Sequence, residues 1–79
     1  MKCHIVYFSS SDGEIIIGVA SSKEKIDHVI LNYMKERSED YEDKLESFPE
    51  LKIENIKQLK KKWHKSMDEE FYSNEYELV

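Results

Sequence analysis

The chain has 79 residues, of which 39% are hydrophobic, 37% are charged and one is cysteine. This length allows one small domain, residues 1–79, near the lower size at which a hydrophobic core holds a fold without help. A single cysteine excludes an internal disulfide and the thiolate cluster of a structural zinc site. The net charge of −5 is too acidic for a generic nucleic-acid binder.

The sequence shows no targeting or membrane segment. The first eight residues form only a short apolar run, interrupted by His4, whereas a secretory signal needs a longer apolar core. No segment approaches the length that crosses a bilayer. Together with the lone cysteine, this predicts a soluble, cytoplasmic protein with no cofactor and no membrane partner. Abundant Lys, Glu, Ile and Tyr with few Gly and Pro indicate a low-GC bacterial or phage gene.

Residues 4–20 predict a β-hairpin. Two runs rich in β-branched and aromatic residues flank Asp12-Gly13, which is typical of a two-residue turn. With Asp12 and Gly13 as the loop, Ser11 pairs with Glu14 and alternation defines two faces. The face expected in the core contains Val6, Phe8, Ile15, Ile17 and Val19, with Phe8 opposite Ile17 and Val6 opposite Val19. The other face contains Ile5, Tyr7, Ile16 and Gly18, with Cys3 at its end.

The segment that follows predicts an amphipathic helix. Residues 21–24 match a capping box, in which a serine hydroxyl and the side chain of Glu24 satisfy backbone N–H groups at the helix start. Beyond it, apolar residues recur at helical spacing. They are Ile26, Val29, Ile30, Tyr33 and Met34.

The middle of the chain changes from acidic to basic. Between residues 35 and 50 acidic residues dominate, and a helically spaced apolar set ends at Pro49, which indicates a short helix or a frayed continuation. That set is Tyr41, Leu45 and Phe48. From about Glu54 a further helix is expected, surrounded by lysines. Its apolar stripe is Ile56, Leu59, Trp63 and Met67.

The chain closes with a predicted strand. After a polar break at residues 68–70, residues 71–79 alternate, with Tyr72, Tyr76 and Leu78 on one side. The element order predicts an α+β fold: a β-hairpin, an amphipathic helix, a helical middle and a C-terminal strand completing a small three-stranded sheet packed with helices. The sequence leaves open which hairpin edge the last strand joins.

The two ends resemble a group of small uncharacterised bacterial and phage domains. Residues 18–24 (GVASSKE) resemble the G-V-x-S-S-x-E turn of this group, and residues 71–78 (FYSNEYEL) resemble its closing strand. The resemblance implies a strand–strand–helix–strand core and assigns no activity. The helical middle, residues 39–69, is longer than the group leads us to expect.

Cysteine and histidine do not predict a catalytic or metal site. Cys3 and His4 are neighbours on a strand and therefore point to opposite faces, so they cannot easily share a proton or a metal. His28 and His64 lie on different predicted helices, without metal-ligand spacing. We therefore predict no catalytic, cofactor-binding or metal-binding residue, and not an enzyme.

Charged segments offer a nucleic-acid interpretation. Lys57, Lys61 and Lys65 align on one helical face and are candidate phosphate contacts. The alternative is a solvated helix face, with Trp63 in the core stripe, and this alternative is favoured. The acidic stretch 36–50 would mimic a DNA backbone, although Arg37 and interspersed lysines dilute its field.

The second hairpin face favours a binding function. Ile5, Tyr7 and Ile16 are too apolar for a solvated sheet side. Either the second long helix covers this face, which is slightly favoured, or a partner does, such as an unknown protein or a second copy of the chain. The leading prediction is a small non-enzymatic binding or regulatory protein, phage- or mobile-element-encoded, that acts by protein–protein contact. The alternative is a nucleic-acid-linked role.

Overall fold

The computed structural model describes residues 2–77 and confirms the α+β fold. Three antiparallel strands form one open sheet in the order β2-β1-β3. The elements in chain order are β1 (Lys2–Ser10), β2 (Gly13–Ala20), α1 (Lys23–Arg37), a 3₁₀ turn (Ser38–Tyr41), α2 (Glu42–Leu45), a second 3₁₀ turn (Ile53–Asn55), α3 (Ile56–Met67) and β3 (Glu70–Glu77). In this described part, no helix is both long and apolar enough to cross a membrane.

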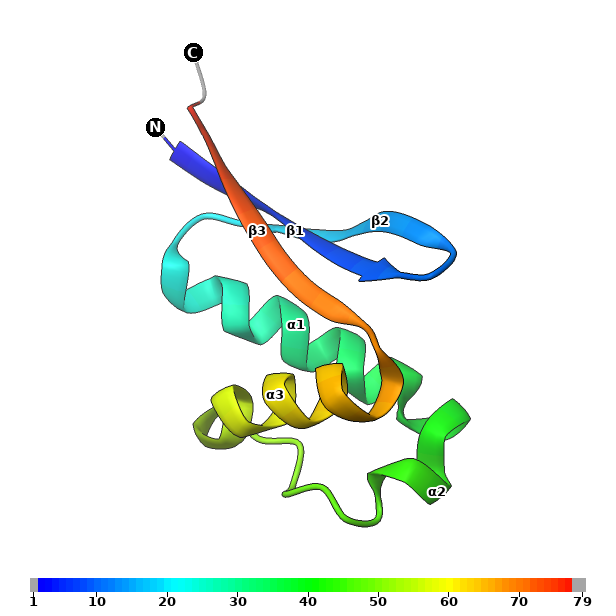
Figure 1. The fold of residues 1–79 in the computed structure, drawn as a ribbon. Coiled ribbons are helices and arrows are strands. Elements are labelled where there is room, and N and C mark those ends of the chain that lie inside the picture. The colour runs from blue at the N-terminus through cyan, green and yellow to red at the C-terminus, as the bar shows by residue number, and fades with distance from the viewer. Residues whose placement is uncertain (1, 78–79) are drawn as a thin grey trace.

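The helices form a layer on one side of the sheet. Figure 1 shows α1 and α3 on the same side of the three strands, with α2 farthest from them. We call this side of the sheet the inner face and the opposite side the outer face. The core lies between the inner face and the helices, where apolar side chains from β1, α1 and α3 meet. Its most buried members are Val6, Ile30, Met34, Leu59 and Trp63.

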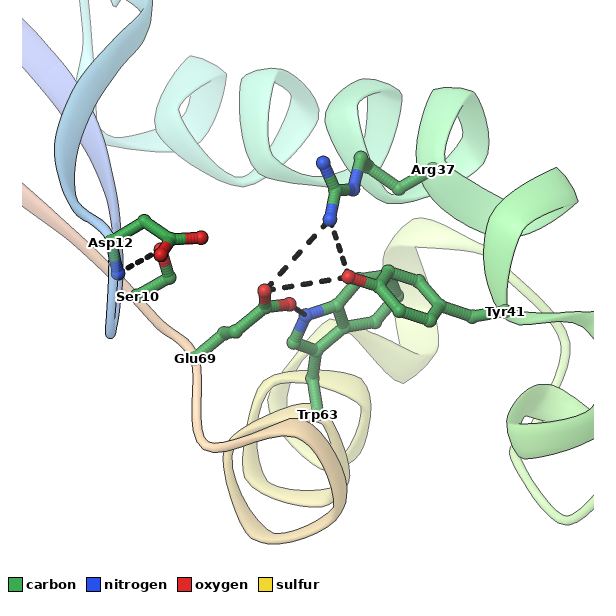
Figure 2. Close-up of polar contacts among 6 residues, drawn as sticks. All are labelled: Ser10, Asp12, Arg37, Tyr41, Trp63 and Glu69. Carbon is green, nitrogen blue, oxygen red and sulfur yellow. Dashed lines mark hydrogen bonds and ion pairs between the residues drawn. The ribbon is translucent and has the colours of Figure 1, made fainter.

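The hairpin is present, but the predicted loop is wrong by one residue, and the predicted pairing between the loop and the bulge is therefore wrong by two. Ser10 pairs with Gly13, so Ser11 and Asp12 occupy the loop instead of Asp12 and Gly13. The backbone N–H of Asp12 donates to Ser10 Oγ at 3.3 Å (Figure 2). Gly13 follows the loop with φ of 123°, a conformation that favours glycine. Gly13 is therefore the first residue of β2, and its positive φ lets the chain leave the loop and enter the strand.

A β-bulge in β2 changes which side chains face inward. Ile15 lies opposite Phe8, and Gly18 lies opposite Val6, which leaves Ile17 as the extra residue. The predicted pairs Phe8–Ile17 and Val6–Val19 are therefore wrong. Val19 points to the outer face opposite Ile5, where its side chain is 63% exposed. The bulge thus moves Val19 out of the predicted core.

Gly18 moves in the opposite direction, from the predicted second face to the inner face. A Cβ at this position would lie 2.6 Å from Val29 Cγ1 on α1. The absence of a side chain therefore allows α1 to approach β2 closely. Ile15, which was expected in the core, lies on the inner side near the loop and is 51% exposed.

Helix α1 follows the predicted apolar stripe. Ile30 and Met34 are buried, and Ile26 and Val29 pack partly buried against the core. The predicted capping box is wrong, because Ser22 occupies the N-cap position without a side-chain hydrogen bond to the helix. Leu31, outside the predicted stripe, is also buried and belongs to the same core cluster.

The remaining elements agree with the predicted order. The acidic middle forms a 3₁₀ turn and the short α2, which ends before Pro49, and its apolar set packs partly buried against the core. Helix α3 buries Ile56, Leu59 and Trp63. Asp68 ends α3 in the left-handed region, with φ of 55° and its N–H bonded to the carbonyl of His64 at 2.9 Å. The chain then reverses into β3.

Strand β3 resolves the edge that the sequence left open. It pairs antiparallel with β1 on the side away from β2, from Ser9–Glu70 to Lys2–Glu77, without a register shift. Tyr72 and Tyr76 share one face, as predicted, and Leu78 lies outside the described residues. Strand β1 is therefore central, and β2 and β3 are edge strands.

Candidate functional site

The predicted candidates Ile5, Tyr7 and Ile16 lie together on the outer face. Tyr7 pairs with Ile16 on β2 and with Tyr72 on β3, while Ile5 pairs with Val19 and Asn74. Residues directly opposite each other in antiparallel strands share a face. The outer face is therefore one surface across three strands. Its members are Cys3, Ile5, Tyr7, Ile16, Val19, Tyr72, Asn74 and Tyr76.

Within residues 2–77, no element covers the outer face. The slightly favoured prediction, that the second long helix covers it, is wrong because α1 and α3 both pack on the inner face (Figure 1). Ile16 is 61% exposed and Tyr76 is 43% exposed, in addition to the exposed Val19. An uncovered surface that contains aliphatic and aromatic side chains across a whole sheet is typical of an interaction site.

Tyrosines give the outer face a fixed shape. Tyr7 stacks on Tyr72 with ring centroids 4.9 Å apart and an interplanar angle of 13°. The hydroxyls of Tyr7 and Tyr76 are hydrogen-bonded at 3.1 Å. This hydrogen bond raises the pKa of Tyr7, and the interaction with Glu14 raises the pKa of Tyr72 to about 12. Tyr7 and Tyr72 are therefore uncharged at neutral pH and present aromatic rings with polar hydroxyl tips.

Charge on this side of the sheet is confined to one end. At the hairpin end, Ser9 pairs with both Glu14 and Glu70, so two carboxylates border the outer face there. None of the outer-face residues is basic. The surface is thus apolar and tyrosine-rich with an acidic border, which suits a partner with an apolar centre and a basic residue at one end.

The predicted phosphate contacts lie on a different element. Lys57, Lys61 and Lys65 are exposed on α3, and none of them forms an ion pair with another residue of the described chain. Trp63 is fully buried in the core, as the favoured alternative predicted. It is therefore not available to stack on a base, and the three lysines remain as point charges on a helix surface.

The cysteine and the histidines are kept apart. His4 is buried on the inner side, whereas Cys3 is half-buried on the outer face. His28 and His64 are exposed on α1 and α3. Across residues 2–77, no group of three or more His, Cys, Asp or Glu side chains is arranged to hold a metal ion.

A partly buried polar cluster, which sequence reasoning missed, joins the end of α1, the 3₁₀ turn that follows it, α3 and Glu69, the residue before β3 (Figure 2). Glu69 is 8% exposed, and its Oε1 accepts a hydrogen bond from Trp63 Nε1 at 2.9 Å. Its Oε2 lies 3.5 Å from the hydroxyl of Tyr41 and 3.8 Å from Nη2 of Arg37. Arg37 also donates to the Tyr41 hydroxyl and lies over the rings of Phe8, Tyr33 and Tyr41.

This cluster serves the fold. Burial lowers the pKa of Arg37, but the hydrogen bond to Tyr41 and the neighbouring Tyr33 and Glu69 raise it further, so the net shift is upward and the guanidinium stays charged. The carboxylate of Glu69 satisfies the indole N–H that the core would otherwise leave unpaired. A sequence signal existed: a tryptophan in an apolar stripe needs an acceptor, and Glu69 lies six residues later, just before the strand.

Comparison with known proteins adds no relative. No protein-family model matches the chain, and no curated protein and no solved structure shows significant similarity to it. The resemblance of the two ends to small bacterial and phage domains therefore stays a prediction. The candidate function rests on the surfaces described above.

Proposed function

We propose that this protein is a small non-enzymatic binding or regulatory protein that acts by protein–protein contact through the outer face of its sheet. The observation that carries the proposal is the uncovered surface of Ile5, Tyr7, Ile16 and Val19 beside Tyr72 and Tyr76. Aromatic residues, tyrosine among them, are enriched at protein interfaces. A cytosolic location and a bacterial or phage gene belong to the same proposal, supported by the single cysteine and the composition.

The acidic border defines the partner further. Glu14 and Glu70 flank Ser9 at the hairpin end, so the partner places a lysine or arginine there and an apolar patch over Ile5 and Ile16. Charge complementarity of this kind fixes orientation and speeds association more than it adds affinity. The partner is therefore expected to bind in one orientation, with a rate that falls as salt rises.

Site-specific photo-crosslinking tests this proposal. A crosslinking residue replaces Ile16 on the outer face or, as the control, the exposed Lys25 on α1. In extracts of the cell that carries the gene, we expect one adduct from position 16 and none from position 25. Excess unlabelled protein should compete the adduct away, whereas the Val19→Lys variant should not. Equal adducts from both positions, no adduct at all, or competition by Val19→Lys would contradict the proposal.

The second candidate is nucleic-acid binding through α3, favoured by the three exposed lysines without ion pairs. Contacts from Lys57, Lys61 and Lys65 to three phosphates predict a slope of about −2 to −3 for log affinity against log salt, depending on the strand type. Salt-titrated binding to DNA and RNA tests this, with alanine at the three positions as the matched variant. The absence of salt-dependent binding would rule out direct nucleic-acid binding by α3. Mimicry of DNA by the acidic residues 36–50 would then be tested by measuring binding to a DNA-binding protein.

A further inference from the structure

The free edge of β3 is bordered by a channel. Two shallow hollows that share Lys60 form it. The first lies between β3 and α3 and is lined by Lys60, Lys61, His64, Glu70, Phe71 and Tyr72. The second lies where β3 and β1 face the start of α1, and its lining includes Lys60, Asp27, Ser73 and Glu75.

The edge beside this channel is regular. β3 pairs only with β1 and without a register shift, so its second row of backbone N–H and C=O groups lacks a strand partner within the described chain. Such a row is a template for another strand, and eight residues extend over about 27 Å. The other edge, β2, contains the bulge at Ile17, a device that discourages strand addition. The two edges are therefore not equivalent, and β3 is the one suited to strand addition.

The charges of the channel define what a fourth strand must look like. Lys60 and Lys61 of α3 line the channel. Lys60 forms an ion pair with Asp27 at 3.5 Å, whereas Lys61 forms no ion pair within the described chain. Side chains of an added strand that point inward would lie over these lysines. Those that point outward would extend the row of Tyr72 and Tyr76. The occupant therefore alternates acidic residues with aromatic or apolar ones.

Strand β3 itself has this pattern. Its outer side chains include Tyr72 and Tyr76, while Glu75 and Glu77 lie on the inner side. If two copies pair antiparallel about Asn74, Tyr72 of one copy lies opposite Tyr76 of the other. Glu77 then lies opposite Phe71 and Glu75 opposite Ser73, which are residues that line the channel. No two glutamates are directly opposed, whereas pairing about Glu75 would oppose two carboxylates.

We propose that two copies of the chain pair through their β3 edges, antiparallel about Asn74, with Glu77 of each copy beside Lys61 of the other. The result is one six-stranded sheet with two-fold symmetry. The two outer faces lie side by side in this dimer and stay open, so the proposal goes beyond outer-face binding and does not depend on it. The acidic α2 region, farthest from the sheet in Figure 1, does not take part.

A charge swap between two variants tests this arrangement. Glu77→Lys places a lysine against the lysines of the other copy, and Lys61→Glu places a glutamate against its glutamates. Both residues are exposed, and neither forms an ion pair within the described chain. Each variant alone should weaken the dimer about tenfold, because like charges then meet at two symmetric sites. Mixing the two variants in equal amounts brings opposite charges together at both sites and should restore the dimer.

Sedimentation equilibrium from about 10 μM to about 1 mM measures the association. Lys25→Glu and Glu54→Lys change the net charge by the same amounts at exposed positions elsewhere and should leave the affinity unchanged. A wild-type chain that stays monomeric across this range, or variants whose mixture does not restore association, would overturn the proposal. A dimer that Ile16→Lys abolishes and the charge variants leave intact would also overturn it, and would instead show contact through the outer face. Failure of the β3 dimer and failure of outer-face binding are thus separate results.

Discussion

The two faces of the sheet are built from alternate residues of the same strand. Val6 and Phe8 point inward and are buried against the helices, whereas Ile5 and Tyr7 point outward. Both faces contain apolar residues, but only the inner face is covered by α1 and α3 (Figure 1). The comparison shows that apolar character in a strand does not by itself identify the core. What decides is which face the helices reach.

The largest expected difference in the free energy of unfolding is between valine-to-alanine substitutions on the inner and outer faces. Val6→Ala removes two methyl groups from a fully buried site and should lower the free energy of unfolding by about 2–3 kcal/mol. Val19→Ala removes the same atoms from the exposed outer face and should change it by less than about 0.5 kcal/mol. Urea unfolding of the two variants measures both values. Equal losses at the two positions would show that the outer face is covered in the folded chain.

A second difference lies between buried and exposed polar groups, because a buried donor that loses its acceptor costs more stability than an exposed one. Glu69→Leu leaves the buried N–H of Trp63 without its acceptor and should cost about 1–3 kcal/mol of stability. Glu69→Gln keeps an acceptor and should cost less. The matched control, Glu70→Gln, changes an exposed neighbour and should be close to neutral. Tryptophan fluorescence during denaturant unfolding follows all three variants, and a neutral Glu69→Leu would contradict the role of the cluster.

The next prediction concerns Gly18, at the point where the inner face of β2 contacts α1. Gly18→Ala places a Cβ 2.6 Å from Val29 Cγ1 and should cost about 1–2 kcal/mol by overpacking. Val29→Ala removes the opposing methyl groups, so the double variant should lose less stability than the two single variants combined. Additive losses in this double-mutant cycle would show that Gly18 does not contact α1.

The smallest effect on stability is expected from the tyrosines of the outer face. The pKa of Tyr72 rises from 10.0 to about 12 through its interaction with Glu14. A raised pKa stabilises the folded state below pH 10, and this contribution is lost as the pH rises from 10 to about 12. Unfolding free energies should therefore fall over this window, and less so for Tyr72→Phe. In a spectrophotometric titration, Glu14→Gln should lower the pKa of Tyr72, and an unchanged pKa would contradict the assigned cause.

Periodicity in the sequence was sufficient for the elements and for most of the core. Ile56, Leu59 and Trp63 repeat at helical spacing and are buried as predicted. The register of the hairpin was not predictable in the same way. Asp12-Gly13 suggested a loop at those two residues. The loop is instead Ser11-Asp12, and Gly13, with its positive φ, is the residue that follows it. The run of three isoleucines at 15–17 contains no alternation, so it gives no signal of the bulge at Ile17.

The candidate site was predicted in part. Ile5, Tyr7 and Ile16 do share a face, although Tyr7 pairs with Ile16 and not with Gly18 as the predicted register required, because a displacement of two residues preserves the alternation. Val19 and the tyrosines of β3 join that face only through the bulge and the pairing of β3 with β1. Both depend on how the strands pair with one another and not on the pattern within one strand. Local sequence preferences do not encode them.

The most direct measurement of the open outer face is the reactivity of thiols placed on the two faces. In a Cys3→Ser background, Val19→Cys and Val6→Cys put one cysteine on each side of the sheet, and a disulfide reagent reports their rates at low protein concentration. We expect the thiol at position 19 to react nearly as fast in the folded chain as in urea, while the thiol at position 6 is protected until the chain unfolds. Protection at position 19 in the dilute folded chain would contradict the account, because it would mean that the protein covers this surface itself.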